Sequence, residues 1–332
     1  MTFKKSFGVV AALVVTVLAA SRTSPPSGSI TVCSSGCNYN TIQKAVSSIS
    51  TSSKDEHSIF IYSGTYTEQV TVPVLSGKLN IYGYTTDTTD YSGNVVNLEW
   101  KSALATGAAD DEHTAALINT SPNVAVYNIN IKNTYGKPTG SNGQAIALSA
   151  YNTEQGYYGV GLYGYQDTLL AQTGNQIYAN CYIEGAVDYI FGQHARAWIT
   201  NSKIASIGAG AITASGRASS SDTSYYVITD STIEAGSTAP AAGTVYLGRP
   251  WGAYARVAFQ RCSLSNIINS AGWEVWSTSD TRTQDVSFGE YSNTGDGAKG
   301  TRASFSTKLS SAITIATILG SDYAEWVDSA YL

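Results

Sequence analysis

Short strand-like segments recur along most of this chain at intervals of about 20 residues, which is within the range of solenoid repeats. We interpret each of the following as one strand: residues 59–62, 79–82, 125–131, 176–184, 197–205, 225–234 and 257–265. The interval is irregular at both ends of the chain and tightens between Ile183 and Ile204. No helix-length segments alternate with these strands, which disfavours a doubly wound α/β sheet. The pattern predicts an all-β solenoid in which each coil stacks on the last, with a jelly roll or sandwich as the alternative.

A second regularity concerns polar side chains that could take part in catalysis. The intervals from Gln144 to Gln166 and from Gln166 to Asp188 are both 22 residues, and Asp167 follows Gln166 directly. Neighbouring strands of a stacked solenoid lie ~4.8 Å apart, so residues one coil apart come into contact range. Two carboxylates and two carboxamides would then share one surface patch. Such a patch suits acid–base and nucleophilic chemistry on an ester or a sugar.

The two ends of the chain differ from the repetitive middle. Lys4 and Lys5 precede an apolar run over residues 7–18 that ends in small residues, which is the pattern of a secretory signal peptide. We therefore expect residues 1–20 to be removed and residues 21–332 to form one secreted, extracellular domain. Residues 40–49 predict a short helix, capped by Asn40, over one open end of the solenoid. The tail from residue 304 is expected to pack along the outside.

The net charge of the chain limits the classes of molecule that it can bind. Without Lys4 and Lys5, 17 basic residues face 24 acidic ones, a net charge of −7. Nucleic-acid binding requires a basic footprint, so this balance argues against it. We expect no membrane partner and a monomer. An oxidising compartment would let Cys33 and Cys37 pair, whereas Cys181 and Cys262 are expected to be buried thiols.

Individual residues support an active site to different degrees. Asp188 lies within an apolar run, where an acidic residue needs a partner or a function, and Arg249 is a candidate partner. Trp251 lies two residues after Arg249, on the same side of an extended strand. A sugar-stacking platform could consist of Trp251, Phe191, Tyr189, Tyr163 and Trp276, although each alone could equally fill the core. The glycine pattern at residues 159–164 resembles a dinucleotide fingerprint, but no helix follows it.

Five segments together resemble the signature blocks of the pectin methylesterase family, in the family's order and spacing. They are GTYTE (residues 64–68), QAIAL (144–148), QDTL (166–169), VDYIFG (187–192) and LGRPW (247–251). The resemblance covers almost the whole mature chain and is closest to the secreted fungal members. Tyr189 departs from it mildly, since many members have Phe there.

This resemblance implies a fold and a reaction. The fold would be a right-handed parallel β-helix, and the reaction would be demethylation of methyl-esterified homogalacturonan without a cofactor. Matched residue by residue, Asp188 is the nucleophile and Asp167 the general acid and then base. Gln144 and Gln166 match the oxyanion-stabilising glutamines. Two further matches are the arginine that holds the nucleophile and the substrate-contacting tryptophan, at Arg249 and Trp251.

Two aspartates with different roles must differ in pKa. We expect Arg249 to lower the pKa of Asp188, and the adjacent negative charge to raise that of Asp167. An acidic-to-neutral optimum follows, because Asp167 must start protonated. Two other functions remain open from the residues alone. A glycoside hydrolase would use Asp167 and Asp188 to cleave the pectin backbone, and a pectin-binding protein would have no need of the paired acids.

Overall fold

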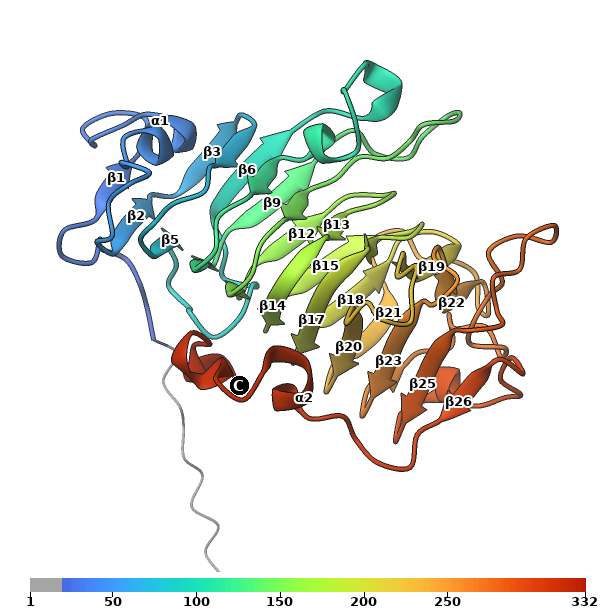
Figure 1. The fold of residues 1–332 in the computed structure, drawn as a ribbon. Coiled ribbons are helices and arrows are strands. Elements are labelled where there is room, and N and C mark those ends of the chain that lie inside the picture. Colours follow the sequence, from blue (N-terminus) through green and yellow to red (C-terminus); the bar gives the residue numbers. More distant parts are fainter. Residues whose placement is uncertain (1–19) are drawn as a thin grey trace, which may run out of the picture.

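The computed structural model describes residues 20–332, so the predicted signal peptide lies almost wholly outside the described residues. These residues form three parallel sheets, which we call sheets 1, 2 and 3 (Figure 1). Sheet 1 contains β1 (Ile30–Val32), β2 (His57–Ile61), β5 (Leu79–Gly83), β8 (Val124–Tyr127), β11 (Gln155–Tyr158), β14 (Thr173–Ala179), β17 (His194–Thr200), β20 (Tyr225–Thr229), β23 (Arg256–Gln260), β25 (Ser287–Tyr291) and β26 (Ser306–Lys308).

The other two sheets are shorter. Sheet 2 contains β3 (Gly64–Thr67), β6 (Val96–Trp100), β9 (Asn130–Asn133), β12 (Gly161–Tyr163), β15 (Tyr182–Gly185), β18 (Lys203–Ser206), β21 (Thr232–Ala235) and β24 (Ser263–Leu264). Sheet 3 contains β4 (Val70–Val72), β7 (Leu117–Asn119), β10 (Leu148–Ala150), β13 (Leu169–Ala171), β16 (Ile190–Gly192), β19 (Gly210–Ser215) and β22 (Val245–Pro250). From β2 to β24 the chain visits sheets 1, 2 and 3 in turn on each coil. The predicted right-handed parallel β-helix is confirmed.

All five of the longer segments predicted as single strands are in fact two strands from different sheets. Residues 176–184, for example, contain the end of β14 and the start of β15. The break falls at the polar residue that precedes each aliphatic position by three. That residue has a left-handed backbone conformation, with φ between 50° and 55° at Asn128, Asn180, Asn201, Asp230 and Arg261. Asparagine and aspartate tolerate this conformation, so the chain turns sharply there from sheet 1 to sheet 2.

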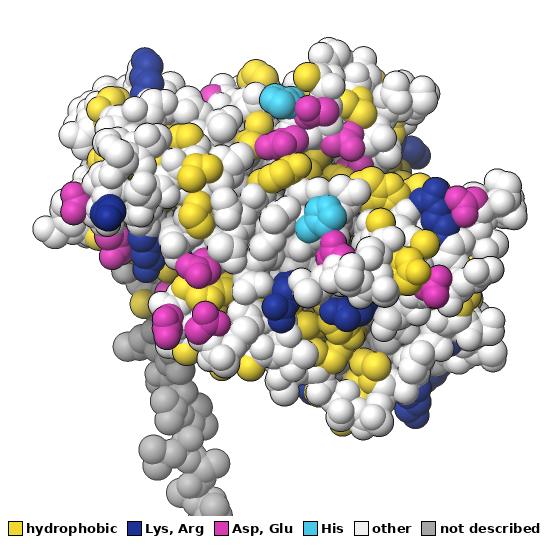
Figure 2. Space-filling model, in the orientation of Figure 1, with side chains coloured by type: hydrophobic (Ala, Val, Ile, Leu, Met, Phe, Trp, Pro, Cys, Tyr) yellow, Lys and Arg dark blue, Asp and Glu magenta, His cyan; other side chains and the backbone are white. Residues whose placement is uncertain are grey.

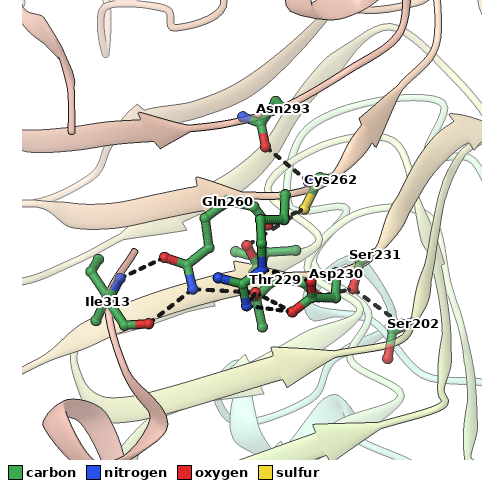
Figure 3. Close-up of polar contacts among 10 residues, drawn as sticks. Ser202, Thr229, Asp230, Ser231, Gln260, Cys262, Asn293 and Ile313 are labelled. Atoms are coloured by element: carbon green, nitrogen blue, oxygen red, sulfur yellow. Dashed lines mark hydrogen bonds and ion pairs between the residues drawn. The ribbon is translucent and has the colours of Figure 1, made fainter. Parts of the chain in front are cut away.

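Side chains link these turns from coil to coil. Arg261 donates hydrogen bonds of 2.7 and 2.6 Å to the two carboxylate oxygens of Asp230, one coil away. Gln260 precedes Arg261 in the chain. Its side chain donates a hydrogen bond to the Ile313 carbonyl and accepts one from the Ile313 amide, in the C-terminal tail (Figure 3). The corner between sheets 1 and 2 is thus fastened both along the stack and to the tail.

The interior of the coils is filled by aligned side chains. Leu148, Leu169 and Ile190 occupy equivalent positions on β10, β13 and β16, and all three are fully buried. The rings of Tyr157 and Tyr178 stack at 5.0 Å between centroids in the same way. Identical positions on successive coils therefore form continuous columns, and a residue's position in its coil determines whether it faces the core or solvent.

Within the described residues, the structure contains two short α-helices: α1 (Ile42–Ser47), at the N-terminal end of the solenoid, and α2 (Ile315–Leu319), which packs on β14 and β17 of sheet 1. Ile42, Ala45 and Val46 of α1 are buried against the first coils, which confirms the capping helix (Figure 1). Its cap was assigned wrongly, however. The Thr41 hydroxyl accepts the hydrogen bond from the backbone of Lys44, so Thr41 and not Asn40 caps the helix.

The C-terminal tail lies along the outside of sheet 1, as expected (Figure 1). It contains α2 and the single-turn helices η4 (Tyr323–Glu325) and η5 (Ser329–Tyr331). The Tyr331 ring packs on Tyr127 and Tyr158, and the Asp328 amide donates to the Tyr158 hydroxyl at 2.9 Å. The outward aromatic column of sheet 1 is thereby covered.

The cysteines behave as predicted. Cys33 and Cys37 form a disulfide, and Cys181 and Cys262 are buried free thiols. The one sequon asparagine, Asn119, is fully buried and donates to the Tyr157 hydroxyl, so it does not present its amide to solvent. In the described part of the chain, no helix has the length and apolar character needed to span a membrane.

Candidate active site

The predicted site residues meet at the edge where sheet 2 turns into sheet 3. Asp167 and Asp188 lie just before β13 and β16, and the register of these strands pairs Leu169 with Ile190. The same register places Asp188 directly beside Asp167, one coil further along. The interval found in the sequence, from Gln166 to Asp188, therefore exceeds the coil period by one position. Gln166 aligns with Val187, not with Asp188.

The backbone at both aspartates has an unusual conformation. φ is 64° at Asp167 and 50° at Asp188, in the left-handed region. The Asp167 amide donates to the Val187 carbonyl at 3.0 Å, and the Asp188 amide donates to the Ala211 carbonyl at 2.8 Å. Two successive coils thus turn in the same way at the same position, and the two short side chains project into one pocket.

Arg249 reaches Asp188 from a later coil. It lies near the end of β22, where the register places it beside Ala214, which in turn lies beside Phe191. Its Nε and one terminal nitrogen donate to the two Asp188 oxygens at 2.9 and 2.7 Å. This bidentate pair fixes the plane of the carboxylate, as the resemblance implied. The guanidinium also lies 4.5 Å from the centre of the Trp276 ring.

Burial and neighbouring charges separate the two acids. Burial raises the pKa of Asp167 well above its ordinary value, and the negative charge of Asp188 raises it further. Burial also raises the pKa of Asp188, whereas the hydrogen bonds and positive charge of Arg249 oppose that rise. Arg249 thus acts in the expected direction, but desolvation outweighs it, so the pKa of Asp188 is raised overall and not lowered. The expected order of the pair holds, since in the described part of the chain no cation is hydrogen-bonded to Asp167.

The two glutamines lie beside the acids on neighbouring coils. The Gln144 and Gln166 side chains both line the same pocket as the aspartates. The Ala145 amide donates to the Gln166 carbonyl at 3.2 Å, which joins the two segments. Among residues 20–332, neither side-chain amide has a hydrogen-bonding partner within the protein, so both are available to a bound molecule.

The predicted aromatic platform is only partly present. Phe191, Trp251 and Trp276 line the pocket, and the rings of Phe191 and Trp251 lie 6.1 Å apart. Tyr189 was predicted to contact substrate, and this is wrong. Its side chain is fully buried and its hydroxyl hydrogen-bonds to Ser206 inside the coil. Strand alternation would place Tyr189 on the same side as Phe191, but Tyr189 precedes β16 and directly follows the left-handed turn at Asp188, which points its ring into the core.

Two acidic residues near the site had not been predicted. Asp111 lines the pocket from the insertion between β6 and β7, just before η2 (Glu112–Thr114). Glu274 lies close enough to Arg249 for each to affect the pKa of the other. Neither falls on the regular interval of the coils, because both belong to connections between coils. The run of acidic residues at 110–112 was the only sequence signal for Asp111.

The resulting pocket has a volume of about 300 Å³. Its lining consists of Asp111, Gln144, Gln166, Asp167, Asp188, Phe191, Ala214, Arg249, Trp251 and Trp276. It brings together a carboxylate held by an arginine, a second carboxyl of raised pKa, two free amides and aromatic surfaces. This combination can attack a carbonyl, stabilise an oxyanion and protonate a leaving group.

Comparison with known proteins supports this interpretation. The model of the pectinesterase family matches residues 29–313. The chain is 52% identical over 331 residues to a pectinesterase of Aspergillus aculeatus, covering 98% of this chain and 99% of that protein. It is 53% identical over 321 residues to a pectinesterase of Aspergillus niger, covering 96% of each.

Solved structures agree with the sequence comparison. The deglycosylated pectin methylesterase from Aspergillus niger has a TM-score of 0.88 and 41% identity, and the match covers 94% of this chain and 100% of that one. The pectin methylesterase from carrot has a TM-score of 0.81 and 25% identity, with coverage of 93% and 98%. The similarity extends over the entire β-helix.

Proposed function

Because this chain belongs to the pectinesterase family, we propose that Asp188 and Asp167 carry out its reaction as nucleophile and acid–base. The chain is a carboxylic ester hydrolase that removes methyl esters from pectin. The ester carbonyl is C6 of a galacturonosyl unit in homogalacturonan, and the products are methanol and a free carboxyl group. The observation that carries the assignment is the bidentate pair between Arg249 and Asp188, with Asp167 one coil away.

In the first half of the reaction, the Asp188 carboxylate attacks the C6 carbonyl. Arg249 holds both Asp188 oxygens, so the attacking group is ionised and oriented before substrate binds. The carbonyl oxygen becomes negatively charged, and the side-chain amides of Gln144 and Gln166 donate hydrogen bonds to it. When the tetrahedral intermediate collapses, the C6–O bond to the methoxy group breaks. Protonated Asp167 gives its proton to that oxygen, and methanol leaves.

The second half removes the acyl group from the enzyme. Asp188 and C6 are now joined as a mixed anhydride, and Asp167 is an ionised base. Asp167 takes a proton from water, and the hydroxide oxygen attacks C6. The anhydride bond breaks, which restores the Asp188 carboxylate and releases the galacturonate carboxyl group. Phe191, Trp251 and Trp276 provide flat surfaces against which sugar rings can pack.

A single assay tests the assignment. On highly methylated pectin, the protein should release methanol and should create no new reducing ends. Asp188→Asn preserves the size of the side chain and tolerates the left-handed backbone, so the fold should survive. We expect a loss of methanol release of at least about 1000-fold. Residual activity of several per cent in a correctly folded variant would refute Asp188 as nucleophile, and new reducing ends would indicate backbone cleavage.

We also propose that the protein is secreted as a monomer after removal of residues 1–20. The disulfide between Cys33 and Cys37 supports an oxidising destination. Few large hydrophobic residues are exposed in the described part of the chain, namely Val74, Val95, Tyr151 and Leu332. N-terminal sequencing of protein from culture medium tests the cleavage, and light scattering tests the monomer. An intact N-terminus or a dimer mass would contradict the respective proposal.

A further inference from the structure

One charged group in the catalytic pocket has no role in the proposed reaction. Asp111 lines the same pocket as Asp167, Asp188 and Arg249. Within residues 20–332, Asp111 is absent from every ion pair, and its Oδ1 is buried without a hydrogen-bond partner. A buried carboxylate oxygen without a partner is costly, so its retention at a substrate cleft calls for an explanation.

The position of Asp111 is held by its backbone. The Asp111 carbonyl accepts hydrogen bonds from the Thr114 amide at 3.1 Å and the Thr114 hydroxyl at 2.7 Å. That hydroxyl in turn accepts from the Ile146 amide at 3.0 Å, two residues after Gln144. The insertion that carries Asp111 is therefore tied to the segment that carries an oxyanion-binding glutamine. Asp111 faces the pocket from a fixed position.

Asp110, the residue before Asp111, points in a different direction. Asp110 is exposed and accepts hydrogen bonds from the His113 ring at 2.7 Å and the His113 amide at 3.0 Å. On the face seen in Figure 2, acidic side chains gather beside a band of hydrophobic ones. Asp110 is exposed to solvent, whereas the side chain of Asp111 lines the catalytic pocket. Its charge reaches the reacting groups, because it contributes to the raised pKa of Asp167.

The charges in the pocket do not cancel. Asp188 and Arg249 neutralise each other, and Asp167 is neutral when protonated. Among the residues that line the pocket, the Asp111 carboxylate is left as a net negative charge facing a cleft that accepts a chain of sugars, and Glu274, near Arg249 but outside this lining, does not offset it. An esterified ring is neutral there, but a ring that has lost its methyl group brings a further negative charge. Like charges in a partly desolvated cleft repel more strongly than in water.

We propose that Asp111 is a specificity-determining residue that disfavours galacturonate rings with a free carboxylate and directs the enzyme to fully esterified stretches. The proposal rests on the proposed function. It implies that a freshly demethylated ring is expelled from the cleft, so successive attacks fall on separate positions along the polymer. It also implies that Asp111 acts through charge and not through shape.

The test compares two substrates. Wild type, Asp111→Asn and Asp110→Asn are assayed near neutral pH on homogalacturonan of high and of low methyl esterification. The readout is the ratio of kcat/KM on the two substrates. Asp111→Asn has the same shape without the charge, and we expect the preference for high esterification to fall by about fivefold to tenfold. The exposed control Asp110→Asn should retain the wild-type ratio.

Ionic strength separates a charge effect from a structural one. Added salt should reduce the preference of wild type and leave that of Asp111→Asn nearly unchanged. An unchanged ratio in a folded Asp111→Asn variant would overturn the inference, and so would an equal fall in Asp110→Asn. Either outcome leaves the proposed function intact if wild type still releases methanol. Absence of methanol release by wild type would instead refute the function itself.

Discussion

Asp167 and Asp188 occupy the same position on successive coils, and both have a left-handed backbone. Asp188 receives two hydrogen bonds from Arg249, whereas within residues 20–332 Asp167 receives none from a cation. Two identical side chains in nearly identical local geometry therefore differ in their electrostatic surroundings. This difference is what the reaction requires, since one acid must be ionised and the other protonated at the same pH.

The pH dependence of kcat/KM should be bell-shaped and should respond to Arg249. Activity falls at low pH when Asp188 becomes protonated, and it falls at high pH when Asp167 loses its proton. Arg249 opposes the rise in the Asp188 pKa that burial causes. Arg249→Gln should therefore move the acidic limb to higher pH, by about one unit or more, along with a large loss of rate.

Arg249→Lys provides the control for this shift. It keeps the positive charge but loses the bidentate geometry, so its acidic limb should move less than that of Arg249→Gln. An acidic limb at the same pH in wild type and Arg249→Gln would show that Asp188 does not set it. The apparent pKa values describe the coupled pair and are read from the complete profile of each variant.

Removal of the Asp167 charge should stabilise the fold. Its pKa in the folded protein is raised well above the ordinary 3.8, so ionisation costs folding free energy. That cost is complete above the folded pKa and disappears as the pH falls toward 3.8. Asp167→Asn should raise Tm by about 1–5 °C at neutral pH. The gain should shrink on acidification, and an equal gain at every pH would contradict this origin.

The sequence predicted the coils better than it predicted their exact period. Strand recurrence indicated the solenoid, but runs such as residues 125–131 contain no glycine or proline to mark the turn at Asn128. The left-handed backbone conformation of such an asparagine depends on how its coil stacks on the neighbouring coils, and the sequence of one segment does not contain that information. The same limitation explains why the interval from Gln166 to Asp188 differs by one position from the true register.

The site residues divide along similar lines. Gln144, Gln166, Asp167 and Asp188 lie on regular coils, so a spacing argument found them. Trp276, by contrast, was proposed only as one aromatic among many, and its position over Arg249 depends on a long connection. Asp111 also lies in a connection between strands, and the lengths of these connections differ from coil to coil. Inserted segments are positioned by tertiary contacts that no periodicity encodes.

The two free thiols should be unreactive in the folded protein. Cys181 and Cys262 are buried, and burial raises the pKa of each thiol to about 12. Since the thiolate is the reactive form, a thiol reagent should label neither in native buffer and both in denaturant. Retention of full activity after native treatment is the accompanying readout. Rapid labelling without unfolding would show that the interior of the β-helix opens locally at these cysteines.

Gly216 should control the position of Trp251. A β-carbon at Gly216 would lie 2.5 Å from the Trp251 ring and 2.8 Å from the Gln193 side chain, closer than real contacts allow. The indole therefore lies over a gap that only glycine leaves. Gly216→Val should displace the ring from the pocket while Asp188 and Arg249 stay paired. We expect KM to rise by about tenfold or more with a smaller change in kcat.

A matched variant distinguishes displacement from general damage. Trp251→Ala removes the same aromatic surface without adding volume, so its KM should rise to a similar extent. The double variant should be little worse than Trp251→Ala alone, because the valine then has no ring to displace. Additive losses in the double variant would mean that Gly216 acts through the β-helix and not through Trp251. Tm measured in parallel shows whether the fold itself has been destabilised.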